Sequence, residues 1–129
     1  MNGHIISSTE APAAIGPYSQ GISVAGWLFF SGQIALDPRS GRLITDDIVA
    51  QTQQVLNNLE ALLLAAQAER HHVVKTTVYL IDLGEFKQMN AVYEQFFKPP
   101  YPARSTVQVA ALPQGARVEI EAIAWNPLR

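Results

Sequence analysis

Arg104 follows a rigid proline turn, in the segment Pro102-Ala103-Arg104-Ser105-Thr106. A guanidinium group carries parallel N–H donors that match both oxygens of a carboxylate, so an arginine beside such a turn suits the capture of a small carboxylic acid. A single arginine more often forms a surface ion pair with a nearby acid. The segment by itself leaves both interpretations open.

Two glutamates, Glu119 and Glu121, lie two residues apart in a run that predicts a central strand. Central strands rarely carry charged residues. From spacing alone, a solvated sheet face is the favoured interpretation. The functional alternative is a carboxylate at a subunit interface, with a raised or partnered pKa, that orients a water molecule.

Other side chains that could take part in chemistry give weaker signals. Tyr18 is typical of a half-buried aromatic residue with a hydrogen-bonded hydroxyl. The glycines form no phosphate-binding loop, and the Ser-Gly-Gln run at 31–33 is not a nucleophile elbow. His71 and His72 are adjacent, which is not a metal-binding spacing, so we predict no metal site there. The sequence has no cysteine, which excludes thiolate catalysis, disulfides and zinc–thiolate sites.

The composition indicates one globular domain spanning residues 1–129. Net charge is −2, and the nine Lys and Arg residues form no run, so no nucleic-acid partner is expected. The N-terminus has no basic segment followed by a long apolar core, and no apolar run reaches about 18 residues, so neither a signal peptide nor a membrane span is predicted. We therefore expect a cytoplasmic protein.

The hydrophobic pattern predicts the element order β-β-β-α-β-α-β-β. Ala25-Gly26 is typical of a tight hairpin turn, and Pro99-Pro100 of a helix stop. The elements with predicted bounds are strands at 21–24, 27–31, 73–81, 105–110 and 117–125, and helices at 46–68 and 83–97.

Both predicted helices have start signals and one apolar face. Thr45 or Asp46 is the expected N-cap of the first, and the Asp82-x-x-Glu85 spacing predicts a capping box for the second. The apolar face of the first helix consists of Ile48, Thr52, Val55, Leu59, Leu62, Leu63 and Ala66. The buried face of the second consists of Phe86, Met89, Tyr93, Phe96 and Phe97.

Two helices can cover only one face of the predicted six-stranded mixed sheet, in an α+β fold. In the last strand, Val118, Ile120, Ala122 and Ala124 share one face and belong under the helices. Both faces of the strand at 27–31 are apolar. A sheet that is apolar on both faces but has helices to cover only one of them should bury the other face against a second subunit. We therefore predict a homo-oligomer.

Several ordered motifs resemble the Rid family (reactive intermediate deaminases, also called YjgF-like proteins), and the likeness runs from about Ile5 to Ala124. The motifs are Ala13-Ala14-Ile15-Gly16-Pro17-Tyr18-Ser19-Gln20-Gly21, Phe30-Ser31-Gly32-Gln33-Ile34, Lys75-Thr76-Thr77-Val78-Tyr79, Asn90-Ala91-Val92-Tyr93-Glu94-Gln95-Phe96-Phe97, Pro102-Ala103-Arg104-Ser105 and Val118-Glu119-Ile120-Glu121-Ala122-Ile123-Ala124.

The resemblance implies a chorismate-mutase-like fold and a homotrimer whose sheets form a central β-barrel, with ligand clefts between subunits. It implies hydrolysis of 2-imino acids such as 2-iminobutanoate and 2-iminopropanoate to 2-keto acids and ammonia, without a cofactor. Such imines leak from PLP-dependent enzymes, so the implied role is to limit the damage they cause. The alternatives are a non-catalytic binder or sensor of small 2-keto acids and, with less support, an RNA-cleaving or translation-inhibiting protein.

The same resemblance implies roles for individual residues. Arg104 binds the substrate carboxylate and Glu119 positions or activates the attacking water. Tyr18, Ser31 and Gly32 line the cleft, and the backbone at Thr106 contacts the ligand. The chain departs from many relatives at Thr106, where they carry Cys, in the short connection at 98–101, and at Gln67, which stands where a Gly is usual.

Overall fold

A computed structural model describes residues 3–45 and 47–128. It contains one six-stranded sheet in the order β1-β2-β3-β6-β4-β5, in which β4 and β5 are parallel and all other neighbours are antiparallel. The strands are β1 (His4–Ile6), β2 (Gly21–Val24), β3 (Trp27–Gln33), β4 (Val73–Leu80), β5 (Ala103–Gln108) and β6 (Val118–Trp125). The helices are α1 (Ile48–Ala65) and α2 (Phe86–Phe96), with 3-10 turns η1 (Arg70–His72), η2 (Leu83–Glu85) and η3 (Pro113–Gly115).

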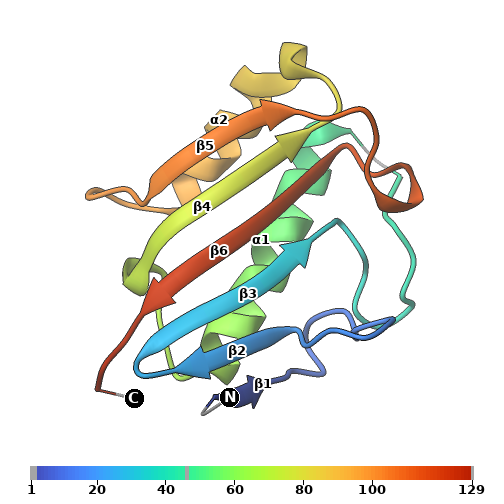
Figure 1. Ribbon diagram of the computed structural model, residues 1–129. Helices are drawn as coiled ribbons and strands as arrows, with labels where there is room; N and C mark the ends of the chain where they lie inside the picture. Colours follow the sequence, from blue (N-terminus) through green and yellow to red (C-terminus); the bar gives the residue numbers. More distant parts are fainter. Residues whose placement is uncertain (1–2, 46, 129) are drawn as a thin grey trace.

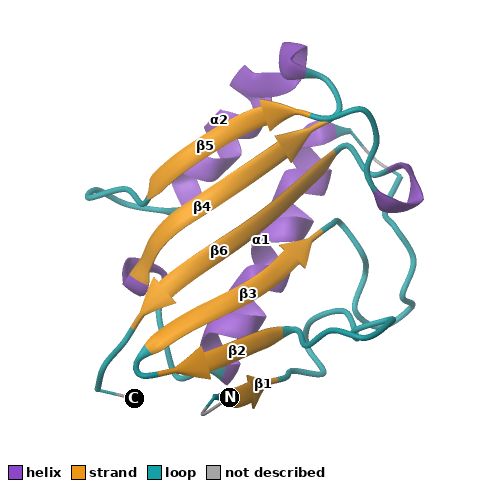
Figure 2. Cartoon of the chain, viewed as in Figure 1, coloured by secondary structure: helices purple, strands orange, loops and turns teal. Residues whose placement is uncertain are grey.

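Both helices pack on one face of the sheet and leave the other face uncovered (Figures 1 and 2). This arrangement confirms the predicted mixed sheet with two helices on one side. The predicted inward residues of β6 are at most 3% exposed, and the predicted apolar face of α1 is buried. On the uncovered face, Trp27, Phe29 and Trp125 are each more than 40% exposed.

The β2–β3 hairpin has the predicted turn. Ala25 and Gly26 both have positive φ values, 52° and 85°, as a two-residue turn of the primed type requires. Strand β3 pairs along its other edge with β6, where the register shifts between Phe30 and Gln33. That irregularity lies at Ser31 and Gly32, two of the candidate site residues.

Helix α1 is shorter than predicted at both ends. Its N-cap is Asp47, whose carboxylate accepts a 2.9 Å hydrogen bond from the backbone N–H of Ala50, so the prediction of Thr45 is wrong. The alternative cap, Asp46, lies outside the described residues. At the other end Gln67 has φ 58°, and the N–H of Ala68 bonds to the carbonyl of Leu63 in a Schellman motif. This left-handed residue ends the helix before the predicted boundary.

The predicted capping box of α2 is wrong. The Asp82 carboxylate does accept a hydrogen bond, from Gly84 N–H at 2.8 Å, but it caps the turn η2 that precedes the helix. The Glu85 carboxylate instead forms an ion pair with Nη1 of Arg117 at 3.1 Å, because β6 brings that guanidinium close. Phe86, predicted to be buried, is 36% exposed and lies beside Arg104.

Strand β5 begins earlier than predicted, at Ala103, and ends at Gln108. Its parallel pairing with β4 starts at Lys75 and Ala103, so Arg104 is inside the strand rather than before it. No helix among the described residues is both long and apolar enough to cross a bilayer.

Candidate functional site

Four of the predicted site residues line one cavity of about 480 Å³ next to strands β3 and β6. They are Tyr18, Ser31, Gly32 and Glu119. The remaining lining residues are Pro12, Ala13, Ile15, Gln20, Gln33, Ile34, Leu36, Pro113 and Gln114. The cavity therefore combines one carboxylate with several neutral polar groups and an apolar wall.

Ser31 is held in place by two hydrogen bonds to the segment that precedes β2. Its backbone N–H donates to the carbonyl of Gln20 at 2.9 Å, and its Oγ donates to the carbonyl of Ser19 at 2.6 Å. Both bonds occur where β3 loses its regular pairing with β6. Irregularities of this kind often redirect side chains next to functional sites.

Glu119 projects from β6 into the space next to Gly32. Burial raises the pKa of its carboxyl group, and the nearby charge of Glu121 raises that pKa further. Within the described residues the Glu119 carboxylate accepts no hydrogen bond, whereas Glu121 accepts one from the Tyr79 hydroxyl. The two glutamates thus differ: Glu121 has a protein partner, and Glu119 has oxygens available for a water or a ligand.

Arg104 lies elsewhere, on the helix-facing side of β5. Its guanidinium carbon is 4.7 Å from the ring centroid of Tyr93 and 5.5 Å from that of Phe86, both on α2 or at its start. The Tyr93 hydroxyl is in turn 2.7 Å from Oγ1 of Thr76 on β4, which fixes the ring. Such cation–π contacts orient a guanidinium without occupying its N–H donors.

The surface ion-pair interpretation of Arg104 finds no support, because its guanidinium pairs with no carboxylate of the described chain. Arg104 lines a cavity of about 350 Å³ together with Asn90, Tyr93, Glu94, Tyr101 and Pro102. Thr106 lies on the same side of β5, and its buried Oγ1 has no hydrogen-bond partner among the described residues. Arg104 and Thr106 therefore lie on the same face of β5.

One chain does not bring Arg104 and Glu119 together. Arg104 pairs with Thr76 and Thr76 with Ala122, three residues along β6 from Glu119. With β4 in between, the Cα atoms of Arg104 and Glu119 are roughly 14 Å apart, from standard strand spacings. The faces also differ, because Thr76 and Ala122 are buried under the helices and Glu119 is on the uncovered side. The predicted site residues of one chain therefore form two separate groups, one with Arg104 and one with Glu119.

Comparison with known proteins identifies the family of the chain. The family described as Endoribonuclease L-PSP matches residues 8–126. The mouse protein named 2-iminobutanoate/2-iminopropanoate deaminase is 51% identical over 93% of this chain and 89% of its own. A Yersinia pestis structure, YyfA of the conserved Rid protein family, superposes with a TM-score of 0.93 at 48% identity and covers 95% of this chain and 98% of its own. The chain belongs to the Rid family.

A third relative in the Rid family carries a ligand. Escherichia coli TdcF, solved with bound serine, has a TM-score of 0.90 and is 42% identical, covering 95% of this chain and 98% of its own. Serine is a small molecule with a carboxylate next to a nitrogen-bearing carbon. Among the described residues of this Rid chain, no group of three or more His, Asp or Glu side chains is placed to hold a metal ion.

Two buried polar residues of this Rid chain line the Glu119 cavity and were not among the predicted site residues. Gln20 is 7% exposed and Gln33 is 6% exposed, and both line the Glu119 cavity. The Nε2 of Gln33 donates to the carbonyl of Ser31 at 3.1 Å. Each glutamine lies within a motif quoted for the family resemblance: Gln33 directly follows Gly32, and Gln20 is two residues after Tyr18. The sequence signal was present, but a buried amide is not distinguishable from a surface glutamine by residue type.

Proposed function

We propose that this chain hydrolyses 2-iminobutanoate and 2-iminopropanoate to the 2-keto acids and ammonia. The observation that carries the proposal is Glu119, a cavity carboxylate with a raised pKa and no hydrogen-bond partner among the described residues, in a chain about half identical to mammalian proteins named for this activity. Imines hydrolyse in water unaided, so a catalyst needs orientation and a placed water rather than a strong nucleophile.

In the proposed reaction, Arg104 binds the substrate carboxylate through its free N–H donors. Glu119 accepts a proton from a water as the water oxygen bonds to the carbon of the protonated imine. The π electron pair of the C=N bond moves to nitrogen, which leaves an amino group and a hydroxyl on one carbon. Proton transfer to the nitrogen then releases ammonia while the C=O bond forms. One water is consumed per turnover, and no electrons are gained or lost.

Because Arg104 and Glu119 lie on opposite faces in one chain, the complete site needs a second copy. We propose a homotrimer with three clefts, each combining Arg104 and Thr106 of one subunit with Tyr18, Ser31, Gly32 and Glu119 of the next. The uncovered sheet face supports this, since Trp27, Phe29 and Trp125 are exposed on it, and the three sheets would line a central barrel in a chorismate-mutase-like assembly.

We further propose that residues 1–129 form a single Rid-type domain that acts in the cytoplasm without a cofactor and removes imines released by PLP-dependent enzymes. The family match over 8–126 supports the single domain. The acidic net charge of −2 is unfavourable for a nucleic-acid partner.

The test is an assay in which an amino-acid oxidase or a threonine dehydratase generates the imine and the loss of imine is followed. Wild type should accelerate hydrolysis, whereas Arg104→Ala and Glu119→Ala should lose about 100-fold or more in kcat/KM, as expected when a transition-state contact is removed. Arg39→Ala is the matched control, because Arg39 is an exposed arginine in a turn and lines neither the Arg104 cavity nor the Glu119 cavity. Wild-type rates from folded Arg104→Ala protein would show the site assignment to be wrong.

The same proteins separate the alternatives. Binding of 2-ketobutyrate without any acceleration of imine hydrolysis would identify a keto-acid binder or sensor instead of an enzyme. The matching family is described as an endoribonuclease, which makes RNA cleavage the other alternative. This alternative would be supported by an RNA-cleaving activity that copurifies with the protein and is absent from purified Arg104→Ala.

A further inference from the structure

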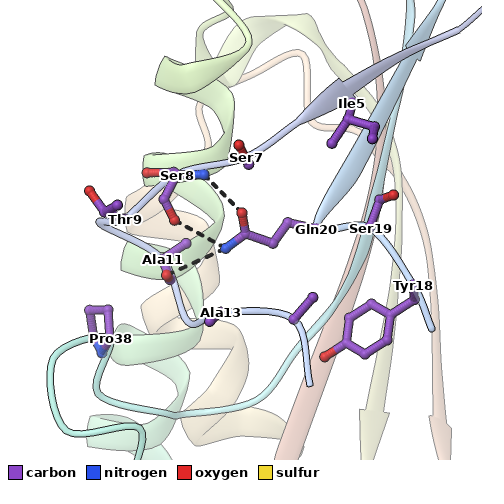
Figure 3. A pocket seen from close by; sticks show the side chains of 11 residues that line it. Ile5, Ser7, Ser8, Thr9, Ala11, Ala13, Tyr18, Ser19, Gln20 and Pro38 are labelled. Carbon is purple, nitrogen blue, oxygen red and sulfur yellow. Dashed lines mark hydrogen bonds between the residues drawn. The ribbon is translucent and has the colours of Figure 1, made fainter. Parts of the chain in front are cut away.

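The amide of Gln20 forms an unusually complete set of hydrogen bonds at the edge of the candidate site (Figure 3). Its Oε1 accepts from the N–H of Ser8 at 2.8 Å. Its Nε2 lies 3.1 Å from the carbonyl of Ser8, 3.4 Å from that of Ala11 and 2.7 Å from that of Pro12, and donates to all three. One buried side chain therefore ties the loop after β1 to the start of β2.

These hydrogen bonds hold the beginning of a segment that has little other support. Ala11 and Pro12 are buried, but residues 13–18 are exposed, including Ile15 at 73% and Tyr18 at 52%. Cavities lie on both sides of this segment, one of about 890 Å³ and the Glu119 cavity of about 480 Å³. A segment with open space on both sides gains little from apolar packing, so its position depends on its hydrogen bonds.

The segment is also one wall of the Glu119 cavity. Ala13, Tyr18 and Gln20 line both cavities, so the segment 13–18 separates them. Figure 3 shows Gln20 at the centre of the larger cavity, with Ser8 and Ala11 bonded to its amide and Tyr18 on the stretch of chain that leads through Ser19 to Gln20. The carbonyl of Gln20 meanwhile accepts the N–H of Ser31.

We propose that Gln20 is a positioning residue for substrate binding: its side-chain amide holds the 13–18 wall, including Tyr18, against the Glu119 cavity. This inference rests on the proposed imine hydrolysis. Glu119 is placed by β6 and by Gly32, so loss of the Gln20 amide leaves the carboxylate in position and loosens only the wall. The affected quantity is KM, because the wall contacts substrate and transition state alike.

The chemistry requires an amide at this position. The site presents one N–H donor, from Ser8, and three carbonyl acceptors, from Ser8, Ala11 and Pro12. An amide supplies both an acceptor oxygen and N–H donors, whereas the carboxylate of glutamate would face the three carbonyls without a donor. Methionine has a similar length and removes every one of these bonds.

The experiment compares Gln20→Met with Gln51→Met, a matched control. Gln51 is also a buried glutamine, 2% exposed, and its amide bonds to the carbonyl of Ile44 and the N–H of Arg117, none of which lines the Glu119 cavity. Both variants should lower Tm. Only Gln20→Met should raise KM for the imine, about tenfold, with kcat within about twofold of wild type. Amide hydrogen exchange over residues 12–19 should accelerate in Gln20→Met alone.

Equal KM values in the two variants, or unchanged exchange over 12–19, would overturn the proposal. The exchange measurement does not depend on turnover. If the wild type does not hydrolyse the imine, the proposed function is wrong, but hydrogen exchange still measures whether Gln20 holds the 13–18 wall. If Gln20→Met does not fold, Gln20→Asn carries the same comparison, because its shorter amide cannot reach all four partners. Wild-type KM and exchange in folded Gln20→Asn would likewise overturn the proposal.

Discussion

The carboxylate of Glu119 occupies the space that a side chain at Gly32 would fill. A Cβ atom built on Gly32 would lie 2.5 Å from Oε2 and 2.9 Å from Cδ of Glu119. Gly32 does not have a positive φ, so its backbone is open to any residue. The glycine is therefore needed for the room it leaves next to the carboxylate rather than for its conformational freedom.

Gly32→Ala should displace the Glu119 carboxylate while the fold remains. We expect kcat/KM for the imine to fall about 10- to 100-fold, since a displacement of about 1 Å in a positioned group costs that much. Circular dichroism and gel filtration should match wild type. Wild-type kcat/KM in Gly32→Ala would show that the carboxylate position is not important for turnover.

Mixed oligomers test whether Arg104 and Glu119 of different subunits form one site. Arg104→Ala and Glu119→Ala are each expected to be inactive alone. Refolded together in equal amounts, they should regain about one quarter of wild-type activity, because that share of head-to-tail interfaces pairs an intact Arg104 with an intact Glu119. Mixtures that stay inactive, although mass spectrometry shows mixed assemblies, would contradict a shared cleft.

The pH dependence of activity should report the raised pKa of Glu119. The carboxylate must be ionised to accept a proton, so kcat/KM should fall as pH decreases through a value above the ordinary 4.5. Because the charge of Glu121 contributes to the shift, Glu121→Gln should move this acidic limb to lower pH. The Tyr79 hydroxyl can still donate to the amide oxygen of that variant. An acidic limb that is identical in wild type and Glu121→Gln would exclude Glu119 as the titrating group.

Gln67→Gly should stabilise the protein. Gln67 has φ 58°, and the left-handed conformation costs a residue with a Cβ roughly 1 kcal/mol. Its side chain is exposed, and its carbonyl bond from Asn126 Nδ2 does not depend on residue type. We expect a higher Tm for Gln67→Gly, measured at one protein concentration, and no gain for Gln67→Ala, which keeps the Cβ. Equal Tm values for both variants would contradict the explanation.

Thr106→Val replaces a buried hydroxyl, which has no partner within residues 3–45 and 47–128, by a methyl group of similar size. Removing an unsatisfied polar group should raise the free energy of unfolding by about 1 kcal/mol. The proposed ligand contact at this position is through the backbone, so imine hydrolysis should continue at the wild-type rate. A large loss of activity would show instead that the hydroxyl itself donates to the ligand.

Patterns that depend on local periodicity were predictable. The buried face of α1 and the inward residues of β6 follow from spacing, because one face of each must leave water whatever its partner is. Element ends were less predictable. The ion pair between Arg117 and Glu85, which replaces the predicted capping box, was not predictable from local sequence. The two residues are far apart in the chain and meet only in the folded structure.

The sequence alone determined the strand and helix order, the two-sided apolar sheet and the family motifs that contain Arg104 and Glu119. Only the tertiary structure decided that these two side chains lie on opposite faces of the sheet. Strand β5 has no apolar alternation, so nothing in Ala103–Gln108 says which side Arg104 occupies. The pairing of Arg104 with Thr76 decides which face Arg104 occupies. Residues paired in register point to the same face, and Thr76 is buried under α2.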